Sequence, residues 1–89
     1  MNISTLRNGM TYVGFSRLMT TEEWSQYCKW MFNHAEGDPN AERIPYERAK
    51  KMGGEYTGSC YEHGPGFVFP NETPESLERT AKSLFPQLF

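Results

Sequence analysis

Four residues of the chain offer thiol or imidazole ligands for a transition metal: Cys28, His34, Cys60 and His63. A tetrahedral zinc site accepts such a set, and zinc would add folding energy to a chain of only 89 residues. However, Cys28 lies on an apolar helical stripe, where a free cysteine behaves as a small hydrophobic residue. His34 lies over the opposite flank of that helix. We therefore expect no cofactor, and we keep a zinc-stabilised module as the alternative hypothesis.

The pair Cys60 and His63 is also the only local candidate for nucleophilic catalysis. A cysteine nucleophile requires a neighbouring imidazole that lowers the pKa of its thiol. On a strand, residues three positions apart point to opposite faces, so this pair would diverge. Acid–base catalysis needs two converging groups, and nothing in the sequence orients Glu55 or Glu62 for that purpose. The sequence therefore predicts a protein that is not an enzyme.

Aromatic residues are abundant, at 15% of the chain. The best-marked helix, at about residues 21–36, begins with a capping box of Thr20 and Glu23. Its apolar stripe is flanked by further large side chains, so more of its circumference is apolar than one core face needs. A chain of this length cannot easily cover two sides of a helix, and Trp, Tyr, Phe and Met are enriched at protein interfaces. Burial between two layers is the alternative to an interface.

We expect this helix, together with two apolar residues at the end of the chain, to bind a protein partner. A frayed apolar tail is the other interpretation of those last two residues. The predicted partner-binding residues are Trp24, Tyr27, Trp30, Met31, Phe32, Leu88 and Phe89.

The remaining elements are shorter. Residues 1–9 look irregular and end in an Asn8-Gly9 turn, after which Val13 and Phe15 share one face of a possible strand. A helix is predicted at 45–52, closed by Gly53-Gly54, and a hairpin is predicted from strands 55–61 and 67–69. The last predicted helix starts at Thr73-Pro74 and ends at Pro86. It is expected to bury Leu77, Ala81, Leu84 and Phe85. Together they predict a single α+β domain, residues 1–89, with about three helices and a small antiparallel sheet or hairpin.

Charge and hydropathy restrict the partner and the compartment. Nine basic and eleven acidic residues give a net charge of −2, so no basic excess is available to neutralise phosphates, and we expect no direct contact with nucleic acid. The apolar runs are too short to span a bilayer, so no membrane is expected. The N-terminus has no signal-peptide pattern, which predicts a cytoplasmic protein with reduced thiols.

In general character, the chain is similar to small accessory proteins of temperate phages and prophages, of the antirepressor or anti-defence type. This resemblance rests on size, expected compartment, aromatic richness and the lack of a catalytic signature, and no motif carries it. It implies a protein that binds and inhibits another protein, such as a repressor or a defence component. The predicted function is therefore that of a protein-binding module, an inhibitor or antirepressor. A homodimer is also expected, because obligate dimers bury apolar patches of this kind.

Overall fold

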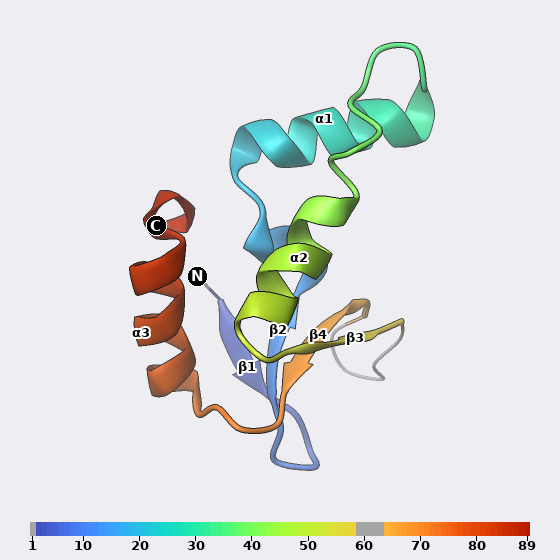
Figure 1. The fold of residues 1–89 in the computed structure, drawn as a ribbon. Helices are drawn as coiled ribbons and strands as arrows, with labels where there is room; N and C mark the ends of the chain where they lie inside the picture. The colour runs from blue at the N-terminus through green and yellow to red at the C-terminus, as the bar shows by residue number, and fades with distance from the viewer. Residues whose placement is uncertain (1, 59–63) are drawn as a thin grey trace.

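The computed structural model describes residues 2–58 and 64–89. Within them, an antiparallel four-stranded sheet in the order β1-β2-β4-β3 is accompanied by three α-helices (Figure 1). The elements are β1 (Ile3–Thr5), β2 (Thr11–Gly14), η1 (Phe15–Leu18), α1 (Thr21–Phe32), α2 (Arg43–Lys51), β3 (Glu55–Thr57), β4 (Gly66–Phe69), α3 (Pro74–Leu84) and η2 (Pro86–Leu88), where η denotes a 3₁₀ helix. The predicted α+β fold is confirmed.

One face of the sheet forms the core. Val13 of β2 lies opposite both Ile3 and Phe67, and Thr11 lies opposite Phe69, so these side chains share a face. Helices α2 and α3 cover this face with small and medium-sized apolar side chains. The core consists of Val13, Leu18, Ala49, Met52, Phe67, Phe69, Leu77, Ala81 and Phe85.

The N-terminal segment was predicted to be irregular, and this prediction was wrong. Residues Ile3–Thr5 form β1, which pairs with β2 at the edge of the sheet. A strand of three residues offers too little alternation for its sequence to be recognised. The predicted Asn8-Gly9 turn is present, and Gly9 adopts a φ of 86°, which only glycine takes up without strain.

The first predicted strand is shorter than expected. It ends at Gly14, and the chain then turns through η1 instead of continuing as a strand through Phe15. The turn places Leu18 at the centre of the core with no exposed surface. The ring of Phe15 still packs against the core, 5.9 Å from the ring of Phe67.

Helix α2 begins at Arg43, two residues before the predicted start, so that Pro45 lies within its first turn. It is closed by Gly53 and Gly54 as predicted, and the closure is a Schellman motif. The amide of Gly53 donates to the carbonyl of Lys50 at 3.1 Å, and the amide of Gly54 donates to that of Ala49 at 2.8 Å. Gly53 has a φ of 79°, the left-handed conformation that this motif needs.

Helix α3 begins as predicted, with Thr73 as N-cap and Pro74 at the first helical position. Leu77, Ala81 and Phe85 are buried against the sheet. The prediction for Leu84 was wrong: this side chain is 48% exposed, because the helix ends there and the following residue, Phe85, enters the core instead. Across the described residues, no helix combines the length and apolar character needed to cross a membrane.

Candidate protein-binding surface

Helix α1 differs from the other two α-helices in how little it packs. None of its twelve residues is buried, and in Figure 1 it lies beyond the sheet, at the end remote from the β1–β2 turn. Trp24 and Met31 are about two helical turns apart and therefore share one side of the helix. Their side chains are 39% and 54% exposed, and that of Phe32 is 90% exposed. This helix thus presents large apolar groups to solvent.

The capping box at the start of α1 is confirmed, but the predicted end of the helix was wrong. The Thr20 hydroxyl accepts from the Glu23 amide, and a Glu23 carboxylate oxygen accepts from the Thr20 amide at 2.7 Å. The helix ends at Phe32 instead of residue 36, and the amide of Asn33 closes it on the carbonyl of Lys29. Gly37, the residue directly after the predicted end, lies beyond the helix and has another role.

Gly37 lets the segment after α1 fold back onto the helix. A Cβ atom at this position would lie 2.0 Å from the backbone nitrogen of Trp30 and 2.7 Å from the carbonyl oxygen of Gln26. No larger residue can approach the helix so closely. The Trp30 ring stacks on the His34 ring, with centroids 4.2 Å apart. We call α1 and this returning segment, residues 21–42, the α1 arm.

An ion pair holds the base of the α1 arm to α2. The two terminal nitrogens of Arg48 donate to the two carboxylate oxygens of Glu23, each at 2.7 Å. One of them also donates to the carbonyl of Leu18, and the guanidinium lies over the Phe85 ring, 5.5 Å from its centroid. The hydrogen bonds from Arg48 hold the pKa of Glu23 below its ordinary value. This partly buried pair fixes the direction in which α1 leaves the body.

A cavity of about 570 Å³ opens where the α1 arm meets the body. Five aromatic rings of the described residues line it, contributed by η1, α1, α2 and β3. They are in mutual contact, from Trp24 and Tyr27, through Phe15, to Tyr46 and Tyr56, with neighbouring centroids 5.1–5.5 Å apart. We call this cavity the aromatic groove; the described residues that line it are Gly14, Phe15, Ser16, Arg17, Trp24, Tyr27, Glu42, Tyr46, Tyr56 and Pro65.

Among the described residues, the lining of the aromatic groove has one charge of each sign, Glu42 and Arg17. Burial is the main reason why the pKa of the Tyr27 hydroxyl is raised, and the negative charge of Glu42 raises it further. The pKa of the Tyr46 hydroxyl is raised by burial too, and Tyr56 and Glu42 contribute. Both tyrosines therefore stay neutral at physiological pH, and the carboxylate of Glu42 is close enough for its field to reach them.

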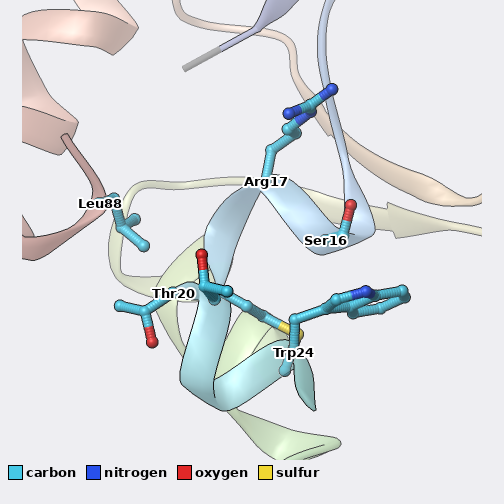
Figure 2. A pocket seen from close by; sticks show the side chains of 7 residues that line it. Ser16, Arg17, Thr20, Trp24 and Leu88 are labelled. Carbon is cyan, nitrogen blue, oxygen red and sulfur yellow. The ribbon is translucent and has the colours of Figure 1, made fainter. Parts of the chain in front are cut away.

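A second hollow, of about 420 Å³, adjoins the start of α1 (Figure 2). Leu88 and Trp24 lie on opposite sides of Thr20 in this view, and the Arg17 side chain extends away from Thr20 and Leu88. Leu88 also packs against the core. Phe89 remains half exposed, and the ammonium of Lys82 lies 5.3 Å from its ring centroid.

The structure brings together only part of the set predicted to bind a partner. Trp24 and Tyr27 stack on each other at the aromatic groove, whereas Trp30 turns to His34 and is half buried. Met31 and Phe32 face solvent at the far end of α1. Leu88 and Phe89 belong to the C-terminal turn, where Leu88 meets Trp24 only across the second hollow.

Three further rings of the groove were not predicted as site residues: Phe15, Tyr46 and Tyr56. They come from three different elements, so no spacing within the sequence relates them to Trp24. The aromatic surplus was the only signal of their presence. Their convergence depends on the tertiary structure.

For the zinc hypothesis, two of the four residues, Cys60 and His63, lie outside the described residues. Cys28 is a half-buried free thiol, and His34 stacks on Trp30. Among residues 2–58 and 64–89, no group of three or more His, Cys, Asp or Glu side chains is arranged to hold a metal ion. The zinc-stabilised module therefore remains a hypothesis.

Comparisons with family models, with curated proteins and with solved structures give no significant match to this chain.

Proposed function

We propose that this protein acts by binding another protein through the exposed apolar side of the α1 arm. The observation that carries this proposal is the state of α1: it has no buried residue, yet it exposes Trp24, Met31 and Phe32. Fully burying a large apolar side chain stabilises a complex by about 1.5–3 kcal/mol relative to leaving it exposed. Three such side chains on one short helix provide the apolar centre of a protein interface.

The way in which the α1 arm is held supports the same proposal. A helix of twelve residues is marginal in water without tertiary packing. Here a capping box, the Arg48–Glu23 ion pair and the close approach of Gly37 stabilise a helix that contributes nothing to the core. Rigid presentation of side chains in advance lowers the entropic cost of binding.

Two expectations from the sequence remain part of this proposal. The first is that the bound protein is inhibited, as for an antirepressor or an anti-defence protein, because a small chain can block a larger partner by occupying its surface. The second is that the protein forms a homodimer, in which the α1 arms of two copies would cover each other's apolar side chains.

A matched set of variants tests the proposal. The double variant Met31→Ala/Phe32→Ala removes the far end of the apolar side, and Leu84→Ala removes an apolar residue of α3 that is about as exposed as Met31. Tagged wild-type protein and both variants are incubated with native lysate, bound proteins are identified by mass spectrometry, and affinities for each purified candidate are measured by calorimetry.

We expect a partner that the wild type and Leu84→Ala bind equally and that the double variant binds at least about tenfold more weakly. Equal binding by all three proteins would contradict the proposal. Light scattering of the same proteins decides whether the partner is a second copy, since the double variant would then change the measured mass.

A further inference from the structure

The rings of the aromatic groove create a surface that attracts positive charge. The face of an aromatic ring carries negative charge density, and a cation placed within about 6 Å of a ring centroid is attracted to it. Trp24, Tyr46 and Tyr56 line the groove and are more than one-third exposed, so a partner's side chain can reach them. Trp and Tyr are the rings that bind cations best.

The carboxylate of Glu42 adds a full negative charge to this surface. Glu42 precedes α2 and lines the groove, and no ion pair joins it to any described basic residue. Its negative charge contributes to the raised pKa of the Tyr27 and Tyr46 hydroxyl groups, so it acts on two of the side chains that line the groove. A cation in the groove would therefore lie among exposed aromatic rings and near a carboxylate that no described basic residue pairs with.

We infer that the aromatic groove receives a basic side chain, an arginine or a lysine, of the protein partner. The inference deepens the proposed function and rests on it, because this side chain would belong to the protein that the α1 arm binds. The groove and the exposed side of α1 are continuous through Trp24 and Tyr27, so one partner can contact both. The cation gives the interface its specificity, and the apolar side chains supply most of the buried area.

The positive charge of Arg17 allows a second test of the inference, because its removal should have the opposite effect to removal of the Glu42 charge. It also lines the groove, and it forms no ion pair with a described acidic residue. Its charge repels an incoming cation, so the basic group of the partner binds near Glu42 and away from Arg17. Removing Arg17's charge should therefore strengthen the binding of a cation, and removing Glu42's charge should weaken it.

The test uses the full chain and a small probe, so it does not depend on knowing the partner. N-acetyl-arginine amide is titrated into ¹⁵N-labelled protein, and the amide shifts of Trp24, Tyr46 and Tyr56 are followed. The matched control is N-acetyl-citrulline amide, which has nearly the same shape and no charge. We expect saturable shifts with arginine, with a Kd on the order of millimolar. Citrulline should bind at least about tenfold more weakly.

Two isosteric or nearly isosteric variants complete the experiment. Glu42→Gln should weaken arginine binding by about tenfold, whereas Arg17→Gln should strengthen it about threefold. Unchanged shifts elsewhere in the spectrum show that both variants keep the fold. Equal binding of arginine and citrulline, no saturable shift in the groove, or weaker binding by Arg17→Gln would each overturn the inference.

Failure of this inference can be told apart from failure of the proposed function. If Met31→Ala/Phe32→Ala loses the partner but arginine does not bind the groove, α1 is the binding surface and the cation site is wrong. If arginine binds as expected but the double variant keeps full affinity for every partner, the function assigned to the α1 arm is wrong and the cation site is supported.

Discussion

Helices α1 and α3 begin with similar sequence signals but differ in burial: α3 packs into the core, whereas α1 does not. They have twelve and eleven residues, and each begins with a threonine N-cap in a capping box. In α3, Leu77 and Ala81 have no exposed surface, whereas no residue of α1 is buried. Capping therefore determines where a helix starts, and other features decide whether it joins the core.

The difference lies in how the apolar residues are distributed. In α3 they are concentrated on the side that meets the sheet, and polar residues occupy the rest. In α1 large apolar residues surround more of the helix, and the sheet face is already covered by α2 and α3. Helix α1 is instead held by the Arg48–Glu23 ion pair, by the contact of the Tyr27 ring with Phe15 and by the close approach of Gly37.

The largest expected effect is in α3. Leu77→Ala should lower the free energy of unfolding by about 2–5 kcal/mol, because a fully buried leucine leaves a cavity in the core. Urea denaturation followed by circular dichroism measures this change. A loss below about 0.5 kcal/mol, as for a surface position, would mean that α3 is not integral to the core.

The next largest effect is expected where the α1 arm joins the body. Arg48→Ala removes charge-assisted hydrogen bonds to Glu23 and a bond to the Leu18 carbonyl, and should cost about 1.5–3 kcal/mol. Lys51→Ala, on the exposed side of the same helix, is the control and should change stability by less than about 0.5 kcal/mol. Similar losses for the two variants would show that the ion pair does not anchor the α1 arm.

The same ion pair predicts a pH dependence. Because hydrogen bonds from Arg48 lower the pKa of Glu23 below 4.5, the unfolded chain takes up this proton first as the pH falls. The stabilisation is therefore present above about pH 4.5 and is lost as the pH drops through the folded-state pKa. Stability measured between pH 7 and pH 2.5 should fall less steeply for Glu23→Gln than for the wild type. Parallel curves would contradict this contribution.

A smaller and local effect is expected at Gly37. Gly37→Ala would place a methyl group against the backbone of Trp30, so the returning segment must move away from α1. Amide exchange should accelerate in residues 26–40 and remain unchanged in the sheet. Gly58→Ala is the control, since among the described residues its added methyl group would meet only ordinary contacts with the Tyr56 ring. Uniform acceleration in both regions would mean that the α1 arm and the body unfold together.

The smallest effect on stability is expected at the far end of the α1 arm. Phe32→Ala should change the free energy of unfolding by less than about 0.5 kcal/mol, because 90% of the side chain is already exposed. Leu77→Ala is expected to have a large effect on the same quantity, so urea denaturation of the two variants measures how differently α1 and α3 contribute to stability. A loss of more than about 2 kcal/mol would show that Phe32 packs in the isolated protein, and would remove it from the binding surface.

The sequence alone determined the α+β class, the starts of α1 and α3, the end of α2 at Gly53-Gly54 and the pairing of β3 with β4. These features depend on residues close together in the chain: caps, glycines with positive φ, and short apolar runs. The tertiary structure alone decided that Leu84 stays outside, that Gly37 packs on α1, and that Phe15, Tyr46 and Tyr56 join Trp24. Those outcomes follow from competition for one sheet face and from contacts between distant segments, which spacing along the chain does not encode.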